Sequence, residues 1–344
     1  MTDRVIASPA AGDDGQLDNS LRPSSLADNE FIGQARLKRG LRVMIQAAQQ
    51  RGEPVDHILL AGPPGLGKTT LANIIAGEMG AHLTTTSGPA LERPGDLLSQ
   101  LRILEPGDVF FIDEIHSLGK VVEEVLYPAM EDFEIDMSVG QGTGHAQVIR
   151  LQLPKFTLIG ATTRSGQLTS ALIDRFGESY RLEFYSPEEC TQIVLRSARI
   201  MDVDVKAEGA SAIARRSRGT ARVCNRLLRR VRDYAQVEAD GIVTDHVAEL
   251  ALEDMAVDRE GLDDMDRRIL TTIIESYGGG PVGLQAIAAS VAEEVTTLES
   301  FYEPFLLQAG FLARTSRGRI ATAKAYNHLG LTTPKPSTQQ SSLL

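Results

Sequence analysis

The 344-residue sequence lacks the features that mark exported or membrane-bound proteins. Its two cysteines, Cys190 and Cys224, are too few for a disulfide framework and form no CxxC pair. No run approaches the roughly 18 apolar residues of a membrane span, and the polar residues 1–20 contain no signal-peptide core. Six scattered histidines show no metal-ligand spacing. We therefore expect a cytoplasmic protein with no membrane segment and no zinc site.

Positive charge is also scarce. The chain has 35 Lys and Arg against 46 Asp and Glu, a net charge of −11, which argues against a surface coated by nucleic acid. The basic residues are nevertheless concentrated in two acid-free islands. Residues 215–232 contain eight arginines, and residues 305–330 contain Arg314, Arg317, Arg319 and Lys324. Each island needs a local explanation.

The apolar pattern divides the chain into three folded parts between two polar tails. Hydrophobic residues make up 42% and charged residues 24%, which is ordinary for a globular protein. We expect disordered tails at 1–20 and 334–344. Residues 21–185 alternate helical patterns with continuous apolar runs at 58–61, 109–112 and 157–160, as in a parallel sheet covered on both faces. Residues 186–257 are predicted to be all helical, and residues 258–333 to form three helices and a hairpin, a winged helix.

A glycine-rich loop follows the first strand. Gly62, Gly65 and Gly67 precede Lys68 and Thr69 in the pattern GxxxxGKT, which requires a strand before it and a helix after it. Such a loop turns backbone N–H groups toward phosphates, while the lysine reaches the β and γ phosphates and the threonine hydroxyl ligates Mg²⁺. A plain glycine-rich turn before a helix is the alternative. The flanking elements favour a phosphate loop for ATP.

Two carboxylates end the second strand. The buried run at 109–112 leads into Asp113 and Glu114, at the sheet edge where ligands of open α/β sheets bind. We expect Asp113 to hold Mg²⁺ through water and Glu114 to polarise the attacking water as general base. Two acids after a strand can also open an ordinary helix. Their combination with Lys68 and Thr69 favours catalysis.

Two further candidates follow the third strand. Thr162 is expected to hydrogen-bond the γ-phosphate or the water, with a simple turn at the strand end as the alternative. Arg175, in an Asp-Arg-Phe run, either forms a local ion pair or reaches the γ-phosphate of a neighbouring subunit. The sequence leaves both roles of Arg175 open.

Together these motifs resemble the AAA+ ATPases and, within them, the bacterial motor subunits of Holliday-junction branch migration. The resemblance covers about residues 21–331. The matching stretches are 21–26 (LRPSSL), 31–34 (FIGQ), 62–70 (GPPGLGKTT), 111–116 (FIDEIH), 160–164 (GATTR), 174–177 (DRFG), 219–222 (GTAR) and 310–319 (GFLARTSRGR). It implies an α/β fold class with an AAA+ P-loop parallel-sheet domain at 21–185, a small helical lid at 186–257 and a C-terminal winged-helix domain at 258–333.

The same resemblance implies roles for individual residues. Arg175 matches an arginine finger that acts on the neighbouring subunit, and Arg222 matches a sensor arginine that touches the γ-phosphate from the lid. The other seven arginines of the first island are then expected to form a solvated helix face, with some paired to the next subunit. The implied catalytic set is Lys68, Glu114, Thr162, Arg175 and Arg222. The implied nucleotide-binding set is Leu21, Arg22, Ile32, Gly62, Gly65, Gly67, Lys68, Thr69, Thr70, Glu131, Asp132, Phe133, Arg175, Tyr185 and Arg222, with Thr69 and Asp113 on the metal.

The second basic island predicts a DNA contact. Arg314, Arg317 and Arg319 alternate around Gly318, so we expect them to project from a hairpin tip and to contact phosphates. No aromatic residues of the kind that stack single-stranded bases are interleaved with them, which favours duplex DNA. A solvated turn is the alternative. Val295 departs from the family, which often has a DNA-contacting arginine there.

The resemblance implies an ATP-dependent motor that translocates duplex DNA in recombination and repair. Its partners would be a homo-hexameric ring, the Holliday junction, a RuvA-type junction-binding protein and a RuvC-type resolvase. The hairpin expected at 133–153 would dock the RuvA-type protein, although its tip at 139–146 is unusually rich in glycine. The alternatives are a clamp-loader-like ATPase, disfavoured by residues 310–319, and an ATP-gated DNA-binding regulator, disfavoured by the intact Glu114.

Overall fold

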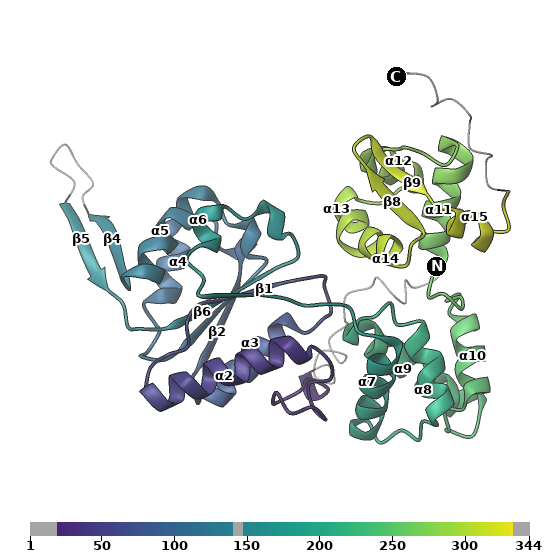
Figure 1. Ribbon diagram of the computed structural model, residues 1–344, viewed down its shortest axis with the longest axis horizontal. Coiled ribbons are helices and arrows are strands. Elements are labelled where there is room, and N and C mark those ends of the chain that lie inside the picture. The colour runs from purple at the N-terminus through teal and green to yellow at the C-terminus, as the bar shows by residue number, and fades with distance from the viewer. Residues whose placement is uncertain (1–18, 140–146, 333–344) are drawn as a thin grey trace, which may run out of the picture.

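The computed structural model describes residues 19–139 and 147–332, which form a sheet domain, a helical domain and a winged helix in chain order (Figure 1). In this view the helical domain lies to the right of the sheet domain, and the winged helix stands above the helical domain. The predicted tails lie almost wholly outside the described residues, as does most of the predicted hairpin tip. The α/β fold class with a lid and a winged helix is confirmed.

The sheet has five parallel strands in the order β2-β3-β6-β1-β7. The three predicted strands are its centre, and their side chains are almost all buried because helices cover both faces. The other two lie at the edges and lack a continuous apolar run, so the sequence pattern did not reveal them. The strands are β1 (Ile58–Ala61), β2 (Leu83–Ser87), β3 (Val109–Asp113), β6 (Thr157–Thr162) and β7 (Glu178–Arg181).

Alternate residues of the central strands enter two separate cores. Phe111 and Ile159 pack with helices α2 and α3, whereas Phe110 and Leu158 pack with α4 and α5 on the other face. An antiparallel hairpin, β4 with β5, projects beyond α5 (Figure 1). These elements are α2 (Ala35–Arg51), α3 (Lys68–Met79), η1 (Gly88–Ala90), α4 (Pro94–Leu101), η2 (Ile115–Ser117), α5 (Lys120–Glu131), β4 (Glu134–Val139), β5 (Gln147–Gln152), η3 (Ser165–Gln167) and α6 (Ser170–Ile173).

The lid consists of four helices, α7 (Pro187–Ile200), α8 (Ala207–Arg215), α9 (Ala221–Glu238) and α10 (Asp245–Asp254). It opens with a capping box, in which Ser186 and Glu189 each accept a backbone N–H of the other. Its apolar faces continue the core that α2 and α3 form on the sheet. The lid therefore packs as an extension of the sheet domain.

The prediction that the arginines of the first island form a solvated helix face is wrong for three residues. Arg216 is 1% exposed and donates to both carboxylate oxygens of Glu249, at 2.7 and 2.6 Å. Arg218 is buried against Asp266, and Arg229 is also buried. The carboxylates that hold Arg216 and Arg218 lie more than 30 residues further along the chain. No local sequence pattern could indicate these pairs.

The winged helix has its own core and matches the predicted three helices and hairpin. Gly318 is required at the hairpin turn because its φ is +141° and a Cβ there would lie 2.5 Å from the carbonyl oxygen of Val282. The elements are α11 (Asp264–Tyr277), α12 (Leu284–Val291), α13 (Val295–Thr297), the π-helix η4 (Leu298–Tyr302), α14 (Glu303–Gln308), β8 (Leu312–Thr315), β9 (Gly318–Ala321) and α15 (Ala323–His328). Within the described ranges, no helix has the length and apolar character needed to cross a membrane.

Candidate nucleotide site

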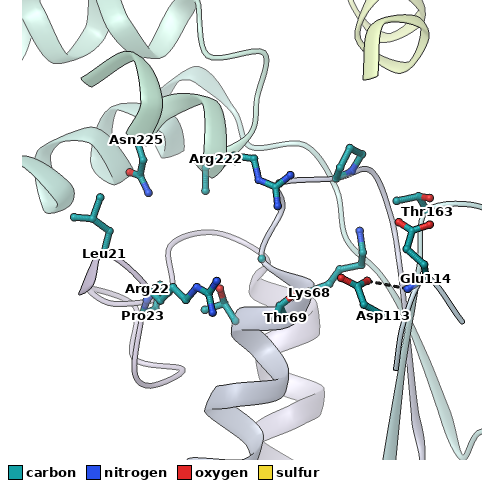
Figure 2. A pocket seen from close by; sticks show the side chains of 15 residues that line it. Leu21, Arg22, Pro23, Lys68, Thr69, Asp113, Glu114, Thr163, Arg222 and Asn225 are labelled. Atoms are coloured by element: carbon teal, nitrogen blue, oxygen red, sulfur yellow. Dashed lines mark hydrogen bonds between the residues drawn. The ribbon is translucent and has the colours of Figure 1, made fainter. Parts of the chain in front are cut away.

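A cavity of about 350 Å³ opens where the sheet domain meets the lid (Figure 2). Its floor is the glycine-rich loop and the start of α3, its far wall is the end of β3, and its roof is the start of α9. It brings together residues from both ends of the stretch 21–225. The lining residues are Leu21, Arg22, Pro23, Pro64, Gly65, Gly67, Lys68, Thr69, Thr70, Asp113, Glu114, Thr163, Ala221, Arg222 and Asn225.

Glycine is required for the shape of the loop. Gly62, Gly65 and Gly67 all have positive φ, and a Cβ on Gly62 would lie 2.9 Å from the Leu182 carbonyl oxygen. No side chain caps the first turn of α3, so its N–H groups face the cavity. The loop and the helix terminus thus offer backbone donors and a positive dipole to an anion.

Lys68 stands at the base of this cavity. Its ammonium is buried and donates to the carbonyl oxygens of Gly62 and Pro63, at 2.8 and 3.0 Å. Burial lowers the pKa of Lys68 to about 8, and the charges of Asp113 and Glu114 partly offset this. Phosphate oxygens would favour the charged ammonium, so the lysine is adapted to an anionic ligand.

Asp113 and Glu114 lie opposite Lys68, as predicted (Figure 2). Asp113 accepts the backbone N–H of Glu114 at 2.9 Å, and Glu114 has a left-handed backbone with φ of 52°. A non-glycine residue in this conformation stores strain, which is common at functional sites. Within the described ranges, no group of three or more histidine, cysteine or acidic side chains could hold a metal by itself. Asp113 and the Thr69 hydroxyl fit a Mg²⁺ ion that takes its other ligands from phosphates and water.

Thr162 does not face the cavity, contrary to the prediction. It is 0% exposed, its hydroxyl lies 3.0 Å from Nδ1 of His116, and the next residue, Thr163, lines the cavity instead. Thr162 is the last residue of β6, and successive side chains of a strand point to opposite faces. The sequence identified the right strand end, but the choice between two adjacent threonines depends on which face packs against η2.

A smaller cavity continues from the first toward the lid and suits the base of the nucleotide. Leu21, Ile32 and Tyr185, which all belong to the implied nucleotide-binding set, line it. The Tyr185 hydroxyl donates to the Leu66 carbonyl oxygen at 3.0 Å, and burial raises the pKa of this phenol far above its usual range. Asn225, which the sequence reasoning missed, lines both cavities. Its position three residues after Arg222, one turn along α9, was the available signal.

Arg222 connects the lid to the loop. Its backbone N–H donates to the Gly65 carbonyl oxygen at 3.3 Å, and its side chain enters the cavity from the lid side (Figure 2). Thr220 caps α9 by accepting the N–H of Val223, which places Arg222 in the first turn of the helix. Any rotation of the lid therefore moves this guanidinium relative to the phosphate loop.

Arg175 and the segment 131–133 lie away from this cavity. The Arg175 guanidinium pairs with Glu131 at 3.2 Å, donates to the Ala171 carbonyl oxygen and lies over the Tyr127 ring at 4.1 Å. Asp132 is exposed beside Glu131, and Phe133 packs against His57. The sequence left two roles open for Arg175, and the first of them, a local ion pair, is present in the structure. These residues can contact a nucleotide only if it is bound by another subunit.

Comparison with known proteins identifies the family. Three family models match consecutive segments, namely the Holliday junction DNA helicase RuvB P-loop domain at 21–182, the RuvB AAA lid domain at 185–258 and the RuvB C-terminal winged helix domain at 259–330. The chain belongs to the RuvB family. Among solved structures it is similar to the Thermotoga maritima RuvB Holliday junction branch migration motor, with 52% identity, a TM-score of 0.83, and coverage of 92% of this chain and 100% of that chain. A mutant of the same Thermotoga protein matches with 52% identity, a TM-score of 0.84, and coverage of 91% and 99%.

The wing of this RuvB-family chain differs from its prediction. Arg314 and Arg319 do not project freely, because both pair with the buried carboxylate of Glu303, at 3.1 and 2.8 Å. The Arg319 side chain is only 17% exposed, whereas that of Arg314 is 55% exposed and Arg317 is exposed at the turn. The hairpin brings the three arginines together as predicted. Glu303 on α14 neutralises part of their charge, which the sequence pattern did not reveal.

Proposed function

We propose that this chain is an ATP-dependent motor that drives Holliday junction branch migration by translocating duplex DNA, in recombination and repair in the cytoplasm. The observation that carries the proposal is one cavity that contains Lys68, Glu114 and Arg222, in a chain that also ends in a winged helix. The similarity to a Thermotoga protein described as a branch migration motor supports the same conclusion.

The cavity supports a division of labour in ATP hydrolysis. Lys68 and the N–H groups of the loop would bind the β and γ phosphates. Thr69 and Asp113 would hold Mg²⁺, which would supply charge neutralisation for the phosphates. Glu114, whose carboxylate is partly exposed, accepts a proton from the attacking water and orients it in line with the γ-phosphate. Arg222 stabilises the γ-phosphate from the lid.

The position of Arg175 supports assembly into a ring, which we propose to be a homo-hexamer. Its guanidinium is 22% exposed and lies outside the cavity of its own chain, so it serves the γ-phosphate bound by the next subunit. The β4–β5 hairpin, which projects from the sheet domain, is the docking element for a RuvA-type protein (Figure 1). A RuvC-type resolvase would act on the same junction.

Hydrolysis is converted into motion by the loss of the γ-phosphate. Arg222 and the neighbour's Arg175 lose a shared anion, so the lid rotates against the phosphate loop to which the Arg222 backbone is hydrogen-bonded. The winged helix follows the lid, because Arg218 of the lid is ion-paired with Asp266 of α11. The wing moves the duplex by contacts with its phosphates.

The test is migration of a synthetic four-way junction by the purified chain with a RuvA-type protein. We expect migration with ATP and Mg²⁺, none without ATP, and none for Glu114→Gln, which should bind ATP but not cleave it. A chain that cleaves ATP only when a sliding clamp is present would instead support the clamp-loader alternative. A chain that binds DNA in response to ATP without DNA-stimulated phosphate release would support the regulator.

A further inference from the structure

A chain of hydrogen bonds leads from Glu114 into the sheet domain. The left-handed backbone of Glu114 directs its carboxylate toward His116, whose Nε2 lies 3.3 Å from Oε2 of Glu114. The backbone is fixed there, because the Glu114 carbonyl oxygen accepts the N–H of Ser117 and leaves no room for a Cβ on Gly88. The geometry therefore holds the carboxylate against the imidazole ring.

Burial determines which atoms donate and which accept in this series of hydrogen bonds. The His116 side chain is 6% exposed, and burial lowers the pKa of its ring, which therefore carries one N–H at neutral pH. Thr162, fully buried, accepts the backbone N–H of Arg164 at 3.0 Å, so its own hydroxyl hydrogen is free to donate to Nδ1 of His116. The remaining hydrogen of the ring is then on Nε2, where it points at Glu114.

The far end of this series of hydrogen bonds, at Arg164, reaches the winged helix. The Arg164 guanidinium pairs with Glu299 at 3.0 Å and donates to the Ser300 hydroxyl at 3.3 Å, both on the π-helix η4. A π-helix in a short element is rare and often marks a functional position. Glu303, which holds Arg314 and Arg319 of the wing, follows directly on α14. The general base and the wing are thus connected through residues in contact.

We propose that His116 is a positioning residue for Glu114, and that the link through Thr162 and Arg164 allows DNA at the winged helix to set the rate of ATP cleavage. The proposal rests on the function proposed above. Phosphates at the wing compete with Glu303 for Arg314 and Arg319, which changes how α14 and η4 pack. A shift of Glu299 moves Arg164 and Thr162, which strengthens the hydrogen bond from Thr162 that orients the ring toward Glu114.

The role of His116 is tested with two substitutions, one polar and one apolar. Gln offers a donor and an acceptor in place of the ring nitrogens, whereas Leu offers neither. We expect His116→Leu to lower kcat roughly 10- to 100-fold, as removal of an orienting partner commonly does, with ATP affinity measured by a fluorescent analogue unchanged. His116→Gln should recover most of kcat. A rise in KM with kcat unchanged, or equal loss in both folded variants, would overturn the proposal.

The link to the winged helix is tested by Glu299→Gln, with Glu275→Gln as the matched control. Both change a single charge on the winged helix, and Glu275 is exposed on α11. We expect Glu299→Gln to keep the DNA-free rate of ATP cleavage and to lose most of its stimulation by duplex DNA, while Glu275→Gln keeps both. Retention of full stimulation by Glu299→Gln would refute the link. If the unaltered chain cleaves no ATP, the proposed function itself fails, which separates the two failures.

Discussion

Arg175 is the residue whose role depends most on a second copy of the chain. Within its own subunit it is held by Glu131, the Ala171 carbonyl oxygen and the Tyr127 ring, and it lies outside the nucleotide cavity. These contacts orient the guanidinium without neutralising it fully, because the Glu131 carboxylate is half exposed and screened by water. An arginine held in this way is suited to act on a neighbour's γ-phosphate.

We predict that Arg175→Ala binds ATP with near-normal affinity but cleaves it roughly 10³- to 10⁵-fold more slowly, the usual cost of losing an arginine finger. Phosphate release and binding of a fluorescent ATP analogue measure the two effects. Mixing Arg175→Ala with Lys68→Ala should restore part of the activity, since some interfaces then combine an intact loop with an intact finger. If no mixing ratio restores activity, Arg175 does not act on a neighbour.

Among the structural elements, the lid depends on one buried ion pair. Arg216 at the end of α8 is enclosed and binds Glu249 of α10 through two hydrogen bonds, and it also donates to the carbonyl oxygen of Asp258, which follows the lid. The hydrogen bonds from Arg216, assisted by its charge, lower the pKa of Glu249. The ionised Glu249 carboxylate therefore stabilises the protein at neutral pH. This contribution is lost as the pH falls from the ordinary pKa of a glutamate toward the lowered pKa of Glu249.

We predict that Glu249→Gln destabilises the protein by about 3 kcal/mol at neutral pH, because it leaves a buried guanidinium without a counter-charge. Urea unfolding followed by circular dichroism measures this change. The difference between Glu249→Gln and the unaltered chain should shrink as the pH falls below the ordinary pKa of 4.5, because the unfolded chain binds the proton there while the native carboxylate, with its lowered pKa, becomes neutral only at still lower pH. A difference that is constant from pH 7 to pH 3 would show that the charge of Glu249 does not matter.

The β8–β9 hairpin carries a second element-scale prediction. Arg317 is exposed at the turn, whereas Arg314 and Arg319 are partly neutralised by Glu303. We predict that Arg317→Ala weakens duplex binding equally for all sequences and reduces the slope of log affinity against log salt by about 1. Arg268→Ala, an exposed arginine on α11, is the control for loss of charge and should leave the slope unchanged. Fluorescence anisotropy at several salt concentrations measures both.

At the scale of the whole molecule, the proposed mechanism requires an active unit of more than one chain. One subunit provides the cavity with Lys68 and Glu114, and Arg175 lies on a different surface of the same chain. On the proposed mechanism, neither surface is sufficient for catalysis alone. The rate per chain should therefore depend on how many interfaces have formed.

We predict that ATP turnover per chain rises steeply with protein concentration and parallels ring assembly, as observed by mass photometry on the same samples. Duplex DNA long enough to pass through a ring should shift the rise to lower concentration, because it binds the assembled form. Full turnover by a dilute sample that contains only single chains would contradict both the ring and the role of Arg175.

The sequence alone was sufficient for much of the nucleotide site. The glycine-rich loop, Lys68, Thr69 and the pair Asp113 and Glu114 lie where their motifs predicted, because each motif is a short local arrangement between a buried strand and a helix. The three central strands were readable for the same reason. Such features depend on neighbours within a few residues, and the order of side chains in the chain records them directly.

Only the tertiary structure decided the remaining assignments. It placed Thr163 rather than Thr162 in the cavity, buried Arg216 against Glu249, and paired two wing arginines with Glu303. In each case the deciding partner comes from a separate element, or the two candidates differ only in which face of a strand they occupy. Burial and charge pairing are properties of the assembled surfaces, so no single stretch of the sequence contains them.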